Sequence, residues 1–337
     1  MRAMQLFSPR PIEERPLLAA EIPVPEAAAD EILVRVRVCG VCRTDLHVVE
    51  GDLAMRKRPI VPGHQVVGVV ARPGLGARRF STGQRVGIAW LHRTCGACAS
   101  CVENRENLCD AAQFTGWSAD GGFAEYALVP EAFAYPIPDS YSDEQAAPLL
   151  CAGIIGYRAL RASAIQPGQR LGFYGFGASA HMAIQVAKFW GCEVFVCTRT
   201  EAHRAWARKL GASWTGDSFE PPPKKLQGAV VFAPAGEVVP PALEALDKGG
   251  TLALAGIHMS AVPPLDYAKH LYHEKVIRSV AHATRKDGEE FLALAAEIGL
   301  RTDVRVFLLE QANEALAAVK SGGTNRAVVL RCSDRPA

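Results

Sequence analysis

The chain of 337 residues has no long apolar run and no large surplus of one charge, and both absences exclude classes of protein. No stretch reaches the roughly 20 apolar residues that a membrane-spanning helix needs. The formal net charge of +2 predicts no basic surface of the kind that nucleic acids require. The segment before Leu18 carries five charged residues and no apolar core, so no secretory signal is expected. We therefore expect a cytoplasmic protein with neither membrane nor nucleic acid as partner.

The ten cysteines do not have the spacing of a disulfide framework. Four of them are grouped, with two residues between each of the first three: Cys95, Cys98, Cys101 and Cys109. This spacing lets one short loop fold its thiolates around a single ion, and tetrahedral Zn²⁺ is the usual ion. Because four protein ligands leave no open position, we expect this zinc to hold the loop and to do no chemistry. Four unrelated thiols or two disulfides are the alternatives.

The pattern of apolar residues changes after Cys151, and the chain length also predicts two domains. Before this point, residues 31–38 and 60–90 carry alternating and β-branched runs, which indicates a small β-rich domain. After it, apolar strands alternate with helical patterns, which indicates a doubly wound parallel sheet and an α/β fold. The strands are expected at 171–174, 192–197, 229–232, 251–255 and 275–281, and the helices at 180–190, 201–210 and 240–246. Two further helices (289–298 and 311–320) and a strand (326–331) are expected to pack back on the first domain.

Three more residues have the chemistry of metal ligands: Cys42, His64 and Cys151. Two thiolates and one imidazole leave the fourth position of a zinc ion for water or substrate, which is the form of a catalytic site. The three residues are far apart in sequence, so their spacing alone does not establish that they form one metal site. A packed turn histidine and a buried core thiol are the alternatives for His64 and Cys151.

Five ordered motifs closely resemble the zinc-dependent alcohol dehydrogenases of the medium-chain dehydrogenase/reductase family. They are Gly40-Val41-Cys42-Arg43-Thr44-Asp45-Leu46-His47, Pro62-Gly63-His64, the four-cysteine group, Gly121-Gly122-Phe123-Ala124-Glu125-Tyr126 and Leu150-Cys151-Ala152-Gly153. The resemblance covers nearly the whole chain. It implies a GroES-like, β-rich catalytic domain (residues 1–152 and 285–337) that holds two zinc ions. It also implies a Rossmann NAD(P)-binding domain (residues 153–284).

The resemblance also implies roles for residues near the proposed catalytic zinc, whose ligands would be Cys42, His64 and Cys151. Asp45 would accept a hydrogen bond from the His64 ring and fix its orientation. Thr44 and His47 would carry the alcohol proton to solvent by way of the nicotinamide ribose, because the ordinary pKa of histidine suits that exchange. An exposed turn carboxylate and a surface histidine are the alternatives for Asp45 and His47.

Two positions depart from the family pattern, and one favours a branch of the family. Gln65 stands where the family has a Glu that approaches the metal, and its amide lacks the negative charge of that Glu. Ile155 stands where the family has Thr, so its contact with the nicotinamide would be apolar. Cys151 stands where polyol dehydrogenases of the family usually have Glu, which favours simple alcohols as substrates.

A dinucleotide fingerprint follows the first strand of the second domain. Gly175, Gly177 and Ala178 belong to a Gly-x-Gly-x-x-Ala turn that opens a helix, where backbone N–H groups can approach a pyrophosphate. An ordinary tight turn is the alternative.

The end of the next strand carries Thr198 and Arg199 in place of the acid that binds the ribose of NAD. With assistance from Arg204, these residues favour NADP(H) over NAD(H). Solvated side chains with loosely bound NAD(H) are the alternative. By resemblance, Arg43 and Arg326 would lie near the pyrophosphate.

The substrate is predicted only as a class: a primary or secondary alcohol with its aldehyde or ketone. Trp90 and Trp117 are candidates to line its pocket, and plain core aromatics are the alternative reading. The resemblance to the family implies a homodimer or homotetramer. The main rival is a medium-chain enone or quinone reductase without catalytic zinc, in which the Cys42, His64 and Cys151 side chains would lie apart. A zinc-ribbon module that binds nucleic acid is a second rival, and the near-neutral charge argues against it.

Overall fold

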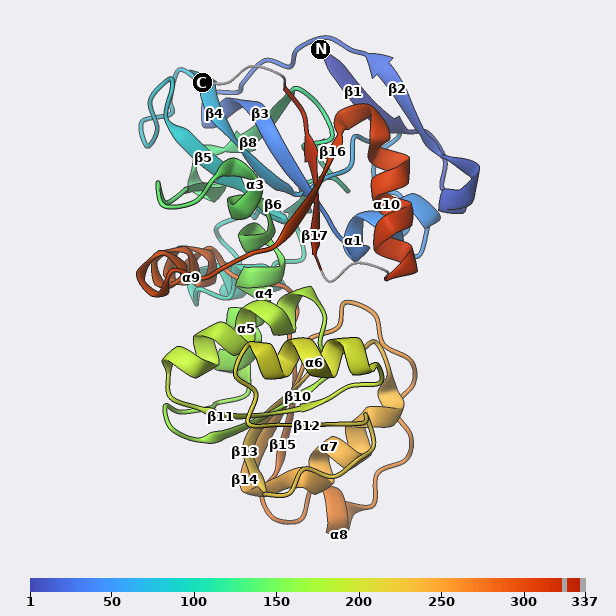
Figure 1. Ribbon diagram of the computed structural model, residues 1–337. Coiled ribbons are helices and arrows are strands. Elements are labelled where there is room, and N and C mark those ends of the chain that lie inside the picture. The colour runs from blue at the N-terminus through green and yellow to red at the C-terminus, as the bar shows by residue number, and fades with distance from the viewer. Residues whose placement is uncertain (323–325, 334–337) are drawn as a thin grey trace. The chain divides into compact units, whose positions relative to one another are not determined.

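The computed structural model describes residues 1–322 and 326–333, and the chain divides into two compact units (Figure 1). The first unit comprises Met1–Cys151, Thr284–Ala296 and Arg301–Ala337. The second comprises Ala152–Ala283 and Glu297–Leu300. Of the predicted segment 285–337, residues 323–325 and 334–337 lie outside the described part of the chain.

The first unit is built around a mixed sheet with the order β16-β17-β3-β4-β5-β9, and β8 pairs with β3 off this path. β3 (Glu31–Val41) is the long central strand, and its alternating Ile, Val and Leu side chains are buried. It pairs antiparallel with β4 in a register that sets Gly40 opposite Gln65. This register brings the end of β3 beside the start of β4, where the first candidate ligands lie.

The remaining elements of the first unit are short and connect the strands of this sheet. The described strands are β1 (Arg2–Leu6), β2 (Leu17–Glu21), β4 (Gln65–Pro73), β5 (Arg85–Ile88), β6 (Leu91–Arg93), β7 (Gln113–Phe114), β8 (Tyr126–Pro130), β9 (Ala134–Pro136), β16 (Val304–Leu308) and β17 (Ala327–Arg331). The α-helices are α1 (Arg43–Glu50), α2 (Ala99–Val102), α3 (Asp143–Ala146), α9 (Arg285–Ile298) and α10 (Ala312–Ser321). The 3-10 helices are η1 (Ile12–Glu14), η2 (Glu106–Leu108), η3 (Glu131–Phe133), η4 (Ala147–Leu150) and η6 (Leu309–Gln311).

The second unit is a parallel sheet with the order β12-β11-β10-β13-β14-β15. This is the doubly wound order in which the first strand lies centrally and the chain winds outward in both directions. The predicted β-rich domain and doubly wound parallel sheet are therefore confirmed. The strands are β10 (Arg170–Tyr174), β11 (Glu193–Cys197), β12 (Trp214–Gly216), β13 (Leu226–Val231), β14 (Leu246–Leu254) and β15 (Val276–Ser279), and the helices are α4 (Ala152–Ala162), α5 (Ala178–Phe189), α6 (Glu201–Lys209), η5 (Gly236–Val238), α7 (Val239–Ala245) and α8 (Tyr267–His270).

Each sheet buries its own apolar core. In the second unit, β10, β11 and β13 are apolar on both faces, as expected of strands covered by helices on two sides. Among the described residues, no helix is both long and apolar enough to cross a membrane.

Candidate metal centres and nucleotide turn

Cys42 lies at the N-cap of α1, directly after β3. Its Sγ accepts a hydrogen bond from the Thr44 backbone N–H at 3.3 Å, and its own N–H donates to Asp45 Oδ2 at 2.8 Å. This reciprocal pattern is a capping box in which a thiol replaces the usual hydroxyl. Because the helix N-terminus carries partial positive charge, it favours the thiolate that a metal needs.

His64 is held from both sides of its ring immediately before β4. Its Nδ1 is 2.8 Å from Asp45 Oδ1, and both side chains are almost completely buried. Its Nε2 is 3.5 Å from Cys42 Sγ. Since the Nδ1–H of His64 donates to Asp45, Nε2 is the nitrogen available to a metal.

Cys151 follows η4 and completes a group of three possible ligands. Its Sγ is 4.0 Å from that of Cys42, and the three ligand atoms all lie within 4.8 Å of one another. Tetrahedral zinc with ordinary Zn–S and Zn–N bonds separates its ligand atoms by roughly 3.5–3.8 Å. The donor set and its spacing therefore fit zinc, with one corner not supplied by these three residues.

The protonation of the cluster is also suited to a cation. A hydrogen bond from Cys151, together with the nearby His64 ring, holds the pKa of Cys42 well below its ordinary value despite burial. The same contact and burial raise the pKa of Cys151. Burial alone would lower the pKa of His64, but the charges of Asp45 and Cys42 outweigh it and raise that pKa to about 10. A divalent cation would replace the protons on Cys151 and on Nε2 of His64, because metal ligands bind in their deprotonated forms.

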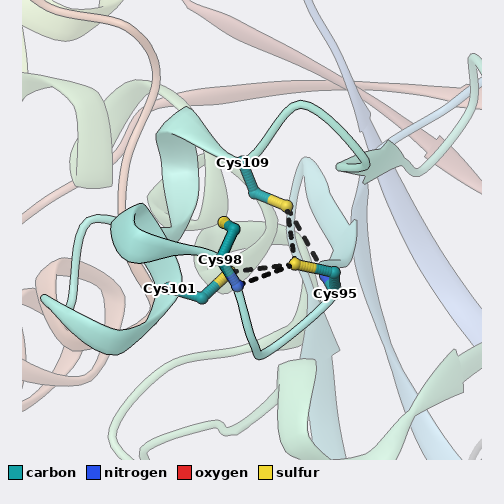
Figure 2. A group of neighbouring side chains, drawn as sticks. All are labelled: Cys95, Cys98, Cys101 and Cys109. Atoms are coloured by element: carbon teal, nitrogen blue, oxygen red, sulfur yellow. Dashed lines mark hydrogen bonds between the residues drawn. The ribbon is translucent and has the colours of Figure 1, made fainter.

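The four grouped cysteines form a second cluster, on the lobe that contains α2 and η2 (Figure 2). Cys95 Sγ lies 3.9 Å from Cys101 Sγ and 3.5 Å from Cys109 Sγ. The N–H of Cys98 donates to Cys95 Sγ at 3.3 Å, as amides around metal thiolates commonly do. Four sulfurs at this spacing fit a closed tetrahedral zinc site. In the same lobe, the buried Glu106 carboxylate accepts from the N–H of Arg285 at 2.9 Å, which ties the lobe to the start of α9.

An aromatic stack lies against the His64 ring. Trp90 meets His64 edge to face at 4.9 Å and stacks on Trp117 at 5.9 Å. The sequence did not reveal two further members: Phe114 stacks on Trp90 at 5.3 Å, and the Arg56 guanidinium lies 4.2 Å from the Trp117 ring. Trp90 and Trp117 are both partly exposed and also pack against the apolar core of the first unit.

The other residues expected near this cluster lie on α1 and β4. Thr44 and His47 are three positions apart on α1, so they lie on the same face of the helix. Gln65 is 3% exposed, and its Nε2 has no hydrogen-bond partner among the described residues. Asp52, which the sequence did not single out, lies 2.7 Å from His47 Nδ1.

The glycine-rich turn connects β10 to α5 in the second unit. Gly175 has φ +90°, and a β-carbon there would lie 2.8 Å from the backbone nitrogen of Ala233, so no other residue fits. Gly177 is the exposed N-cap of α5 and Ala178 is the first helical residue, also exposed. A side chain at Gly177 would meet nothing within 4 Å, so the space above the first turn of the helix is open. This cradle fits a pyrophosphate group.

At the end of β11, Thr198 is buried and Arg199 is exposed. Arg204 donates to the carbonyl oxygens of both, at 2.8 and 3.2 Å, so it braces the turn. Arg204 also pairs with Glu201, the first acid after the strand. Arg43 is exposed on α1.

Arg326, the other arginine expected near the pyrophosphate, is exposed in the first unit. Its guanidinium pairs with Asp303 at 3.2 Å.

The class of protein follows from what each unit supplies. One provides a ligand set with an open corner, which is typical of catalytic metal sites, and the other a sheet of the dinucleotide-binding order. Comparison with known protein families supports the same class of protein. The alcohol dehydrogenase GroES-like domain family matches residues 28–139, and the zinc-binding dehydrogenase family matches residues 180–297.

Relatives that match along nearly the whole chain identify the class of enzyme more closely. The "Probable alcohol dehydrogenase AdhA" of Mycobacterium tuberculosis is 48% identical over 98% of this chain and 97% of its own length. An alcohol dehydrogenase of Geobacillus stearothermophilus is 36% identical over 94% and 97%. A solved NAD-dependent alcohol dehydrogenase superposes with a TM-score of 0.89 at 26% identity, covering 99% of this chain and 100% of its own. A cinnamyl alcohol dehydrogenase of Sorghum bicolor has a TM-score of 0.88 at 26% identity and covers 99% of both chains. The chain belongs to the zinc-type alcohol dehydrogenases of the medium-chain dehydrogenase/reductase family.

Proposed function

We propose that this alcohol dehydrogenase depends on two zinc ions per chain and uses NADP(H) to interconvert alcohols with aldehydes or ketones. In this proposal the first unit is the catalytic domain (residues 1–152 and 285–337), and the second is the nucleotide-binding domain (residues 153–284). The observation that carries it is the convergence of Cys42, His64 and Cys151 within 4.8 Å. A reductase without catalytic zinc has no need of two thiols and an imidazole that meet in this way.

The zinc at these ligands would act as a Lewis acid on the substrate oxygen, and the nicotinamide would give or take the hydride. Asp45 holds the His64 ring and the Cys42 backbone, so it orients two of the three ligands. Thr44 and His47, on one face of α1, are the protein groups that move the alcohol proton outward. The four grouped cysteines would hold a zinc ion that maintains their lobe and leaves no open position for chemistry.

Trp90 and Trp117 would present flat apolar surfaces to the substrate beside His64. This favours small or flat alcohols with a primary or secondary hydroxyl. Gln65, whose buried Nε2 has no hydrogen-bond partner among the described residues, adds no negative charge near the thiolates. We also propose that the enzyme is a cytoplasmic homodimer or homotetramer, because metal-binding thiols suit a reducing compartment and relatives of the family form such assemblies.

The preference for NADP(H) is argued from the turn after β11. The exposed Arg199 can form charge-assisted hydrogen bonds with a 2′-phosphate, and the buried Thr198 leaves no carboxylate to repel it. The first acid in reach, Glu201, is bound to Arg204 and Arg208. NAD(H) stays the alternative, and Gly175, Gly177 and Ala178 would bind the pyrophosphate of either nucleotide, with Arg43 and Arg326 as further candidates.

Steady-state rates with NADP⁺ and NAD⁺, measured on primary, secondary and aromatic alcohols, test this proposal. One hydrogen bond to a charged group is worth about 1.5–3 kcal/mol, so Arg199→Ala is expected to lower kcat/KM for NADP⁺ by roughly 10–100-fold. The value for NAD⁺ should change little. Arg10→Ala, an exposed arginine of the first unit that pairs with Glu14, is the matched control and should affect neither. A wild-type enzyme that strongly prefers NAD⁺ would contradict the assignment.

A further inference from the structure

A carboxylate holds the ring of His47 at the C-terminal end of α1. The distance between His47 Nδ1 and Asp52 Oδ2 is 2.7 Å, which is typical of a charge-assisted hydrogen bond. The His47 side chain is 18% exposed and that of Asp52 is 59% exposed. Since an ionised carboxylate can only accept, Nδ1 of His47 must be the donor.

The turn that ends α1 produces this contact. Gly51 adopts φ +92°, and its N–H donates to the His47 carbonyl oxygen at 3.1 Å. The N–H of Leu53 donates to the same oxygen, also at 3.1 Å. A β-carbon at position 51 would lie 2.9 Å from Cβ of Pro9, so glycine is required both for its dihedral angle and for space. The chain therefore doubles back and brings Asp52 beside the His47 ring.

A second carboxylate near this end of α1, that of Glu50, is engaged elsewhere. Its Oε1 accepts from the Ile12 backbone N–H at 3.0 Å and from Lys320 Nζ at 2.8 Å. Glu50 is thus part of the packing of η1 and α10 against α1. Asp52 is the carboxylate that this turn presents to the ring.

We propose that Asp52 is a positioning residue that fixes the tautomer of His47 with the proton on Nδ1. Nε2 then carries the lone pair: it accepts the alcohol-derived proton to give the imidazolium and releases that proton to water, while the Nδ1 proton stays in place. The proposal rests on the function proposed above for His47 at the outer end of the proton path. Without Asp52, the ring divides between two tautomers, and one of them has no lone pair at Nε2.

The tautomer is read directly by ¹⁵N NMR of the full-length enzyme labelled at histidine, with His47→Gln to assign the signals. The spectra are recorded in alkaline buffer, at about pH 9. The wild type should show a protonated Nδ1 and a lone pair on Nε2 at His47, and Asp52→Asn should give a mixture. A wild-type ring protonated at Nε2, or identical spectra for wild type and variant, would overturn the proposal. This NMR measurement needs no turnover, so it tests the tautomer independently of the proposed function.

Steady-state kinetics test whether the contact between Asp52 and His47 affects the rate of alcohol oxidation. A partly exposed hydrogen bond to a carboxylate is worth about 1 kcal/mol, so Asp52→Asn should lower kcat for alcohol oxidation by roughly fivefold with KM unchanged. Asp52→Glu should restore most of the rate. Asp247→Asn, which removes a carboxylate paired with Arg170 in the second unit, is the matched control and should have no effect.

The same comparison in a His47→Gln background separates positioning from a general effect of charge. There, Asp52→Asn should have no further effect, because no ring is left to orient. An equal fivefold loss in both backgrounds would refute positioning through His47. Full activity of His47→Gln alone would refute the proton path, and the NMR spectra would still decide the tautomer.

Discussion

Replacing Asp45 with Asn is expected to weaken zinc binding at the proposed site of Cys42, His64 and Cys151 and to leave zinc binding by the four grouped cysteines unchanged. Asp45 is almost completely buried and contacts two ligand residues at once. Oδ1 accepts from His64 Nδ1 and Oδ2 accepts from the Cys42 N–H, both at 2.8 Å. The change keeps the volume of the side chain, so it alters hydrogen bonding and charge rather than packing.

The magnitude follows from these two contacts. The Asn oxygen can keep one of them, but its NH₂ group cannot accept from the other donor. Loss of one buried hydrogen bond to a charged group costs about 1.5–3 kcal/mol. Since 1.4 kcal/mol corresponds to a factor of ten, the dissociation constant for this zinc should rise roughly 10–100-fold.

Zinc release to a chelator of graded concentration, followed by metal analysis, measures this effect. The wild type should release both zinc ions at high chelator concentration. The Asp45→Asn variant should lose one ion at a concentration about 10–100-fold lower and retain the other. The four-cysteine site serves as the internal control in the same sample. Release of both ions at the wild-type concentration would refute the role given to Asp45.

Three further predictions concern stability. Glu106→Gln, which removes a charged acceptor from the start of α9, should lower the free energy of unfolding by about 1–2 kcal/mol and speed hydrogen exchange at Arg285; unchanged exchange would count against this contact. Burial lowers the pKa of His92 from 6.5 to about 4. Below pH 6.5 the unfolded chain therefore binds a proton that the folded chain does not, so stability should fall between these values by up to about 3 kcal/mol and then level off. His92→Asn should abolish that slope in acid unfolding curves, and an unaltered slope would contradict the cause. Cys101→Ser should remove the four-cysteine zinc and lower the melting temperature, while the other zinc is retained; loss of both ions would show that the sites are not independent.

Local patterns predicted much of the fold. Most strands and helices of the parallel sheet follow from apolar period and from glycine at the turns, whereas β12 and α4 were not expected. The observed α5 (Ala178–Phe189) and α6 (Glu201–Lys209) differ from expectation by a residue or two at their ends. The four-cysteine cluster is likewise local, because its ligands are close in sequence. α1 was not expected, since it is short and its N-cap is a cysteine rather than a serine or aspartate.

The rest depended on contacts that no local pattern contains. Cys42 and His64 come together through the antiparallel register of β3 and β4, and Cys151 reaches them from η4. The resemblance to a family, not the spacing, suggested this set. Asp52 was missed because its contact with His47 requires the left-handed turn at Gly51. Sequence reasoning identified the chemistry-bearing residues but not the turns that orient them.

Zinc content and alcohol oxidation of a Cys42→Ala variant test the central claim most directly. The variant should contain one zinc per chain in place of two, keep its four-cysteine cluster and lose alcohol oxidation with either nucleotide. A Cys42→Ala protein that still binds two zinc ions and turns over at the wild-type rate would contradict the account, because the open-cornered cluster could then not be the catalytic centre.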